Sequence, residues 1–268
     1  MSRLHRTFAD RKAAGRTALT TFITAGDPTT AATVPALHQL VASGADILEL
    51  GIPFSDPEAE GPAIQASSER GLANGITLAA CLAMVREFRA RDDETPVVLM
   101  GYLNSVLAMG EAAFAAAAAA AGVDGLIMVN LPPEESHSLK SELTANGIDL
   151  IFLIAPTTTP ERTRLIVAEA AGFIYYVSLK GITGADNLNA GEVAEKVAGI
   201  RSLTDVPVQV GFGIKDGSSA RAVGEHADGV VIGSALVRTM SEHTDDAERL
   251  LRLGEQLQSI RQALDSGR

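Results

Sequence analysis

A carboxylate at the end of an apolar segment is the feature of this sequence that most directly suggests chemistry. Residues 48–51 read Leu-Glu-Leu-Gly, so an apolar, strand-like segment carries Glu49 close to its end. A loop rich in glycine and proline follows, and it adds acids at Asp56, Glu58 and Glu60. Burying a carboxylate costs free energy unless the group is paired or used. The two readings are therefore a functional acid and a glutamate just outside the core that points to water.

Aromatic and apolar side chains fall at the ends of neighbouring strand-like segments. The period-two alternation of a strand puts Phe22 on one face with Thr24, and Met100 on one face with Tyr102. An apolar mouth built from these residues around Glu49 would raise the pKa of its carboxyl group. A raised pKa makes a carboxyl group a usable general acid or base. The alternative for Tyr102 is ordinary packing inside the fold.

Glycines follow the last three strand-like segments. Residues 181–185 read Gly-Ile-Thr-Gly-Ala, residues 211–214 read Gly-Phe-Gly-Ile, and residues 233–237 read Gly-Ser-Ala-Leu-Val. Glycine lets backbone N–H groups approach an anion closely, and a helix N-terminus favours negative charge. Turns often contain a single Gly-x-Gly, but three such loops on one rim predict a site for a phosphate-bearing small molecule. Nucleophilic hydrolysis is not favoured, because the chain lacks a Gly-x-Ser-x-Gly motif and a P-loop.

Strand-like and helical segments alternate eight times along the chain, and this alternation must position these residues. The predicted strands are Ala18–Thr24, Ile47–Gly51, Pro96–Gly101, Gly125–Val129, Asp149–Ile154, Gly172–Val177, Val206–Gly211 and Gly229–Ile232. The predicted helices include Ala31–Ser43, Leu78–Ala90, Glu134–Asn146, Pro160–Ala170, Ala190–Ile200 and Asp245–Leu264. Near-continuously apolar strands, each followed by a helix, indicate a parallel sheet that is buried on both faces.

Eight such units in 268 residues favour a closed (β/α)8 TIM barrel of the α/β class over an open sheet. No linker divides the chain, so we expect a single domain over residues 1–268. Residues Ser2–Ala14 are predicted to form an extra N-terminal helix that covers the bottom of the barrel. The active site of such a barrel forms at the carboxyl ends of its strands, where Glu49 and the glycine loops are expected to lie.

Composition and charge exclude several classes of function. The formal net charge of −11 opposes binding to nucleic acid or to an anionic membrane surface. The single cysteine, Cys81, cannot form an internal disulfide, which fits a cytoplasmic location, and it is expected to be a buried, inert thiol. The five histidines are scattered without metal-ligand spacing, so no metal site is expected. The N-terminus lacks the apolar segment of a signal peptide, and no apolar run is long enough to span a membrane.

Several motifs together resemble the α subunit family of tryptophan synthase. They occur in the family's order and spacing over nearly the whole chain. The matching segments are 24–28 (Thr-Ala-Gly-Asp-Pro), 49–57 (Glu-Leu-Gly-Ile-Pro-Phe-Ser-Asp-Pro), 61–62 (Gly-Pro), 100–104 (Met-Gly-Tyr-Leu-Asn), 177–185, 211–214 and 233–234. Other phosphate-binding barrels share the glycine rim but not the Pro-Phe-Ser-Asp-Pro loop.

The resemblance implies a lyase of tryptophan biosynthesis that cleaves indole-3-glycerol phosphate to indole and glyceraldehyde 3-phosphate. This retro-aldol reaction would need no cofactor in this chain. Glu49 would move the protons, Glu60 would hold the indole N–H, and Thr183 would close over the site and orient Glu49. The residues implied to bind phosphate are Gly184, Gly213, Gly233 and Ser234. The residues implied to line the indole pocket are Phe22, Met100, Tyr102, Tyr175 and Phe212.

The resemblance also implies a partner, a pyridoxal-phosphate-dependent β subunit in an α2β2 heterotetramer. That subunit would receive indole through a tunnel and condense it with serine. The loop that contains Pro53, Phe54 and Asp56 is implied to contact it. Loop closure and docking of the partner would then be coupled, each stabilising the active form of the other.

The sequence departs from the family pattern at a few positions near the site. Glu60 and Asn130 stand where the family has aspartate, and Glu58 stands where it has an apolar residue. One extra methylene displaces the carboxylate of Glu60 by ~1 Å, a shift that can weaken a catalytic contact. Two alternatives follow from these departures: a catalytically weakened barrel that mainly activates the β subunit allosterically, or a stand-alone lyase that releases free indole.

Overall fold

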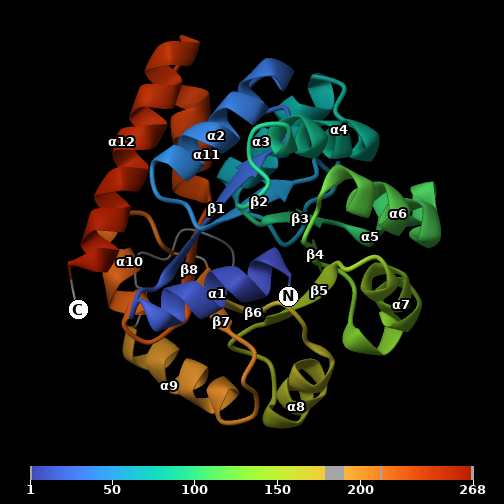
Figure 1. Cartoon of the computed structure of the whole chain (residues 1–268), viewed down its shortest axis with the longest axis vertical. Coiled ribbons are helices and arrows are strands. Elements are labelled where there is room, and N and C mark those ends of the chain that lie inside the picture. Colours follow the sequence, from blue (N-terminus) through green and yellow to red (C-terminus); the bar gives the residue numbers. More distant parts are fainter. Residues whose placement is uncertain (1, 179–189, 212, 267–268) are drawn as a thin grey trace.

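Eight parallel strands close into a barrel in which each strand pairs with the next and β8 pairs with β1 (Figure 1). The computed structural model describes residues 2–178, 190–211 and 213–266. The strands are β1 (Ala18–Thr24), β2 (Ile47–Gly51), β3 (Val97–Gly101), β4 (Gly125–Met128), β5 (Asp149–Ile154), β6 (Ile174–Val177), β7 (Val208–Gly211) and β8 (Gly229–Ile232). The predicted TIM barrel and all eight predicted strands are therefore confirmed.

Helices surround the barrel on its outer face, except α1, which lies at one end of it (Figure 1). They are α1 (Arg3–Ala13), α2 (Thr33–Ala42), α3 (Pro62–Ala73), α4 (Leu78–Arg89), α5 (Leu103–Met109), α6 (Glu111–Ala121), α7 (His137–Ala145), α8 (Pro160–Glu169), α9 (Ala190–Arg201), α10 (Gly217–Gly224), α11 (Ser234–Glu242) and α12 (Asp246–Asp265). Short 3-10 turns, η1 (Thr30–Ala32) and η2 (Pro133–Glu135), precede α2 and α7. Helices α3, α5 and α10 were not predicted from the sequence.

β3 begins one residue later than predicted, at Val97, and β4 ends one residue earlier, at Met128, whereas β6 and β7 each begin two residues later than predicted. β6 begins at Ile174 rather than at Gly172, which has a φ of +67° that a strand residue does not adopt. β7 begins at Val208 rather than at Val206, because Pro207 has no N–H to donate to a neighbouring strand. Both strands still end where predicted, so the positions of their carboxyl ends are unchanged.

Side chains that alternate inward fill the barrel in layers. One layer comes from the four even-numbered strands and contains Glu49, Ile127, Tyr175 and Val231. Deeper in the barrel, the Thr20 hydroxyl donates to Oε1 of Gln209 at 2.6 Å, and both residues are fully buried. Glu49 is thus the acidic member of a layer that is otherwise apolar or aromatic.

The N-terminal helix closes one end of the barrel. α1 lies across the opening at the amino ends of the strands (Figure 1). Its Leu4 and Phe8 are buried among the residues of the barrel interior, and the ring of Phe8 packs against Phe173 with centroids 5.9 Å apart. The predicted helix at Ser2–Ala14 and its position at the bottom of the barrel are confirmed. The opposite end, formed by the carboxyl ends of the strands, is left for the candidate site.

In the described part of the chain, no single helix has both the length and the apolar character needed to cross a bilayer. Among the described helices, α5 and α6 taken together have the length and composition of a membrane span, but they are bent by 99° at the break between them, which is Gly110. Phe114, Ala115 and Ala118 of α6 are buried in the protein core.

Candidate active site

Glu49 lies inside the barrel near the carboxyl end of β2. It is 1% exposed and pairs in register with Phe22 of β1 on one side and Val98 of β3 on the other. Neither carboxyl oxygen has a hydrogen-bond partner in the described structure. Burial, and to a lesser extent the nearby charge of Glu60, together raise the pKa of Glu49 to about 8. The carboxyl group can therefore hold a proton at neutral pH and release it within the working range of an enzyme.

Glu60 is the second buried acid at this end of the barrel. It lies on the loop between β2 and α3, is 6% exposed, and its Oε2 has no partner. Burial raises the pKa of Glu60 to about 7. Burial and the charges of Glu49 and Glu60 also hold the pKa of Tyr175 well above its usual value. The charge of Glu60 thus acts on Glu49, and the charges of both acids act on the Tyr175 hydroxyl.

Tyr102 holds the loop that carries Glu60. Its ring stacks on Phe54 with centroids 4.8 Å apart, and its hydroxyl accepts the N–H of Ala59 at 3.1 Å. The N–H of Phe54 donates to the Ser68 hydroxyl of α3 at 3.2 Å. Both ends of the loop are thus fixed by side chains from the barrel and from α3. Tyr102 lines the pocket together with Glu60, and it has a positioning contact that ordinary packing does not require.

Helix α3 is an element of the site that the sequence analysis missed. The hydroxyl groups of Ser67 and Thr24 are 2.6 Å apart, which joins α3 to the end of β1. Arg70 forms a two-point ion pair with the buried carboxylate of Asp27. Proline is favoured at the first position of a helix, so Pro62 after Gly61 was the signal that could have identified α3.

A cavity of about 20 Å³ remains between these groups. Its lining residues are Phe22, Thr24, Gly51, Ile52, Pro57, Glu60, Ile64, Ser68, Met100, Gly101 and Tyr102. This volume is close to that of one water molecule, so an aromatic bicycle can enter only if side chains or the loop move. Ile64 and Ser68, both from α3, were not among the predicted site residues.

The glycine loops that the structure describes lie on the same rim. Gly213 is exposed with a φ of +77° after β7, and Gly233 precedes Ser234, the first residue of α11, after β8. The first backbone N–H groups of a helix have no partner inside the helix, and they attract an anion. A Cβ at Gly233 would approach Phe22 to 3.3 Å, which places this rim beside the pocket residues.

Gly211 provides space for Tyr175. A Cβ at this position would lie 2.2 Å from the Tyr175 hydroxyl, a distance that real atoms do not adopt. Tyr175 itself is 5% exposed and faces the barrel interior, as expected for a residue of the pocket. The predicted Met100 and Phe22 are also buried in this cluster.

Some predicted site residues lie outside the described part of the chain, and those of the predicted partner-facing loop differ in exposure. Thr183, Gly184 and Phe212 lie outside the described residues. In the predicted partner-facing loop, Asp56 is exposed and Phe54 is partly exposed, whereas Pro53 is buried against Gly71 of α3.

Cys81 fits the prediction of an inert thiol. The residue is fully buried, and burial raises its pKa to about 12. The described ranges contain no cluster of three or more His, Cys, Asp or Glu side chains placed to hold a metal ion.

Comparison with known proteins identifies one family over almost the whole chain. The model of the tryptophan synthase alpha chain family matches residues 8–265. The chain is 55% identical to the tryptophan synthase alpha chain of Thioalkalivibrio sulfidiphilus over 266 residues, which cover 99% of this chain and 100% of the relative. It is 51% identical to that of Halorhodospira halophila over 265 residues, covering 99% and 97%.

Solved structures agree with this result. Tryptophan synthase subunit alpha from Legionella pneumophila superposes with a TM-score of 0.91 at 44% identity, covering 99% of each chain. A chain of Mycobacterium tuberculosis tryptophan synthase in an aminoacrylate-bound form superposes with a TM-score of 0.88 at 34% identity, covering 98% of this chain and 100% of the other. With two buried acids beneath a glycine rim and near-complete coverage in every comparison, this chain belongs to the tryptophan synthase alpha chain family.

Proposed function

We propose that this chain acts in tryptophan biosynthesis as an indole-3-glycerol-phosphate lyase, with Glu49 as the group that moves the protons. The observation that carries this assignment of roles is the burial of Glu49, without a hydrogen-bond partner, beside a second buried acid. Structural carboxylates in a core are normally paired. An unpaired one at the carboxyl end of a barrel strand is suited to catalysis.

Glu49 can serve both proton transfers of a retro-aldol cleavage. In its protonated form it donates to C3 of the indole ring, and the resulting carboxylate accepts the proton of the adjacent glycerol hydroxyl. The carbon–carbon bond then breaks as the hydroxyl carbon becomes the aldehyde, and the bonding electrons return to the ring. Glu49 ends protonated, so the cycle needs no net proton from solvent. A pKa raised to about 8 keeps the starting acid form populated at neutral pH.

Glu60 is suited to a different role. The indole nitrogen becomes electron-poor when C3 is protonated, and an ionised carboxylate that accepts the N–H hydrogen bond stabilises that charge. Glu49 is the more deeply buried acid and therefore holds its proton to higher pH than Glu60. Between their two pKa values, Glu60 is ionised while Glu49 is protonated, and this is the combination that the reaction requires.

The glycine rim binds the phosphate end of the substrate in this proposal. Gly213 and the segment from Gly233 to Ser234 offer backbone N–H groups, which hold an anion without a cluster of basic side chains. This matters in a chain with a net charge of −11. Gly184, Thr183 and Phe212 are proposed to complete the site from outside the described residues.

Replacement of Glu49 by glutamine tests the catalytic role. Glu49→Gln should reduce indole release from indole-3-glycerol phosphate by at least about a hundredfold, because the amide cannot exchange protons. Binding of glycerol 3-phosphate, followed by calorimetry, should remain within a few-fold of the parent value. Glu58→Gln on the same loop is the matched control, since Glu58 is exposed. Near-normal turnover of Glu49→Gln would show that the proton-transfer role is wrong.

The proposed partner is a pyridoxal-phosphate-dependent β subunit in an α2β2 complex. Family membership and the structural match to a Mycobacterium tuberculosis tryptophan synthase support this proposal. The exposed part of loop 54–59 is available for contact, with Asp56 at the surface and the Phe54 ring partly exposed. We do not expect nucleic acid or a membrane as partner.

Size-exclusion chromatography with a cognate β subunit tests this assembly. Co-elution as a complex, weakened by Asp56→Ala, is expected. Separate elution together with indole release would instead identify a stand-alone lyase. A chain that releases no indole but stimulates the β subunit would be the allosteric activator.

A further inference from the structure

A large cleft lies at the end of the barrel opposite to Glu49. Its volume is about 710 Å³, within the range of small-molecule sites and far above that of the cavity beside Glu60. One wall is α1, and the other is formed by the segments that lead into β6, β7 and β8. The lining residues are His5, Phe8, Ala9, Lys12, Arg16, Ala170, Ala171, Gly172, Arg201, Thr204, Asp205, Val206, Pro207, Ala227 and Asp228.

A carboxylate contact repeats around this end of the barrel. Three of the four even-numbered strands are preceded by an aspartate whose Oδ2 accepts the N–H at the start of the previous strand. The three contacts are Leu19 to Asp46 at 2.8 Å, Val97 to Asp124 at 2.8 Å and Val208 to Asp228 at 2.9 Å. Each aspartate also forms an ion pair with an arginine, Arg261, Arg89 or Arg201 respectively. Charged, paired side chains therefore lie at this end of the barrel at β2, β4 and β8, and Arg201 and Asp228 of the β8 contact line the cleft.

The fourth even-numbered strand lacks this contact. The residue at the corresponding position before β6 is Phe173, whose buried ring packs against Phe8 of α1, and the small residues Ala170, Ala171 and Gly172 precede it. A Cβ at Gly172 would lie 3.0 Å from the side chain of Asp149, in a backbone conformation that favours glycine. The small residues before Phe173 line the cleft opposite α1.

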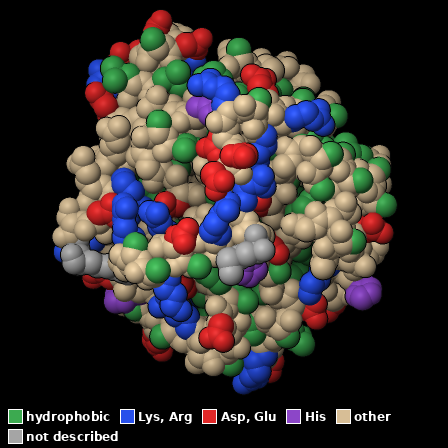
Figure 2. Space-filling model, viewed as in Figure 1, with side chains coloured by type: hydrophobic (Ala, Val, Ile, Leu, Met, Phe, Trp, Pro, Cys, Tyr) green, Lys and Arg blue, Asp and Glu red, His purple; other side chains and the backbone are tan. Residues whose placement is uncertain are grey.

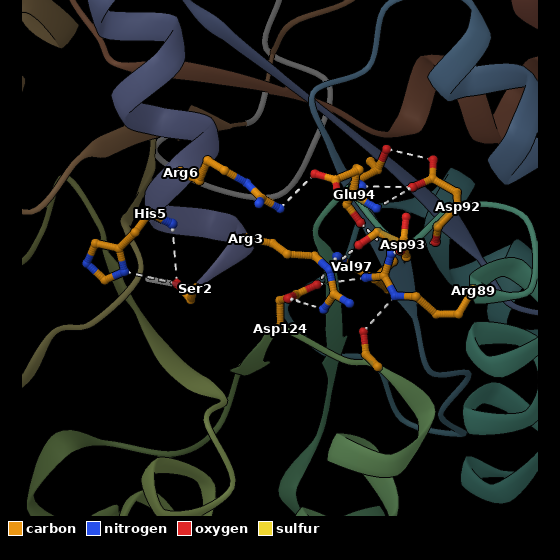
Figure 3. A network of polar contacts seen from close by, with 12 residues as sticks. Ser2, Arg3, His5, Arg6, Arg89, Asp92, Asp93, Glu94, Val97 and Asp124 are labelled. Atoms are coloured by element: carbon orange, nitrogen blue, oxygen red, sulfur yellow. Dashed lines mark hydrogen bonds and ion pairs between the residues drawn. The ribbon is translucent and has the colours of Figure 1, made fainter.

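Helix α1 is fixed to the barrel on the side away from the cleft. Arg3 pairs with Asp124 at 3.0 Å and Arg11 pairs with Asp46 at 3.4 Å. Figure 3 shows Arg3 and Arg6 extending to one side of the helix and His5 to the other. The face of His5, Ala9 and Lys12, spaced by four and three residues, lines the cleft.

The charges in the cleft favour an anion at one end. Lys12 is exposed and has no acidic partner within 4.0 Å among the described residues. Arg16 uses Nε and Nη2 on Asp265, which leaves further N–H donors on its guanidinium group. The acid Asp228 is already neutralised by Arg201, and Asp205 is exposed. Figure 2 shows this face, where Lys and Arg side chains gather between acids around α1.

We propose that this cleft is a second small-molecule site, which binds an organic anion with an apolar body. The carboxylate or phosphate group would lie between Lys12 and Arg16, and the apolar body would pack on Ala9, Val206 and Pro207. The site shares no residue with the candidate active site, so the inference is independent of the proposed lyase reaction.

Titration with four simple probes tests the proposal: benzoate, phenyl phosphate, inorganic phosphate and benzylamine. The purified chain is first saturated with glycerol 3-phosphate, so that the glycine rim is occupied. Calorimetry or NMR shifts should then show binding of benzoate or phenyl phosphate, weaker binding of inorganic phosphate, and none of benzylamine. The preference between benzoate and phenyl phosphate identifies the head group.

Paired variants locate the binding. Lys12→Ala should lower the affinity for the anion about tenfold, because a hydrogen bond to a charged group is lost. Ala9→Phe should abolish binding by filling the cleft, whereas Ala13→Phe on the same helix and Lys196→Ala on α9, both outside the lining, should not change it. All four positions are exposed, so the variants should fold. Unchanged affinity in both cleft variants, preferred binding of benzylamine, or no binding by any probe would overturn the proposal.

Discussion

At the scale of single residues, two carboxyl groups with different surroundings determine what the site can do. Glu49 is surrounded by the barrel interior, whereas Glu60 reaches the pocket from a loop. Burial dominates the raised pKa of both groups, and for Glu49 the charge of Glu60 adds to it. The difference between the two environments assigns the acid role to Glu49 and the anion role to Glu60.

Glu60 also differs in length from the aspartate of the family pattern, and this leads to a prediction. Glu60→Asp should raise turnover severalfold, because the shorter side chain enlarges a cavity of only about 20 Å³ while keeping the charge. The measurement is the rate of indole release at saturating substrate.

Glu60→Gln is the matched control for this prediction. It keeps the length but removes the charge, so turnover should fall and the pKa of Glu49 should decrease. If Glu60→Asp is no faster than the parent, the pocket has adapted to the longer acid.

At the scale of elements, α3 and the end of β3 together position the loop that carries Glu60. The hydroxyl of Tyr102 and the hydroxyl of Ser68 accept N–H groups at the two ends of this loop. Asn130 at the end of β4 provides a similar contact, since its Oδ1 accepts the N–H of Leu103 at 2.9 Å. An aspartate could accept the same bond, so this departure from the family pattern preserves the local geometry.

Removing the Tyr102 hydroxyl tests the positioning of the loop. Tyr102→Phe keeps the stack on Phe54 but leaves the Ala59 N–H without its partner, at a cost of about 1 kcal/mol. We expect kcat to fall about fivefold, with a smaller effect on KM. Tyr176→Phe, on the outward face of β6, should leave both constants unchanged. Equal effects of the two substitutions would contradict a positioning role for Tyr102.

At the scale of the whole molecule, the two ends of the barrel have separate tasks. Glu49 and Glu60 at the carboxyl ends of the strands form no ion pair in the described structure, whereas Asp46, Asp124 and Asp228 at the amino ends are paired with arginines. Asp124 is 4% exposed and binds Arg3, Arg89 and the N–H of Val97 (Figure 3). These contacts join α1, α4, β3 and β4, and they stabilise the frame without reaching the site.

Asp124→Ala should therefore destabilise the protein without changing its chemistry. Removing this carboxylate leaves the largely buried guanidinium of Arg89 unpaired, which should cost about 3 kcal/mol of unfolding free energy. Thermal unfolding followed by circular dichroism measures the loss, and indole release below the transition should stay near the parent rate. Glu94→Ala, which breaks the exposed pair with Arg6, is the control and should have little effect. A loss of activity in the folded Asp124→Ala variant would contradict the separation of tasks.

Much of this architecture could be predicted from the sequence, for physical reasons. Apolar strands such as 47–51 repeat a clear pattern, and barrel geometry then fixes that Glu49 and Tyr102 share one end. Helix α3 was missed because its serines and small residues give little apolar periodicity, with Ser67 and Ser68 buried by hydrogen bonds instead. The aspartate contacts at the strand starts were also missed, since Asp46 and Asp124 look like ordinary turn residues until a strand N–H faces them.

The most direct test of the central claim is the rate of indole release from indole-3-glycerol phosphate by the purified chain, measured from about pH 5 to about pH 9. The reaction as derived needs Glu60 ionised and Glu49 protonated. The rate should therefore rise as Glu60 loses its proton near a pKa of about 7, and fall as Glu49 loses its proton near a pKa of about 8. Absence of indole at every pH, or a rate that does not change across this range, would contradict the account.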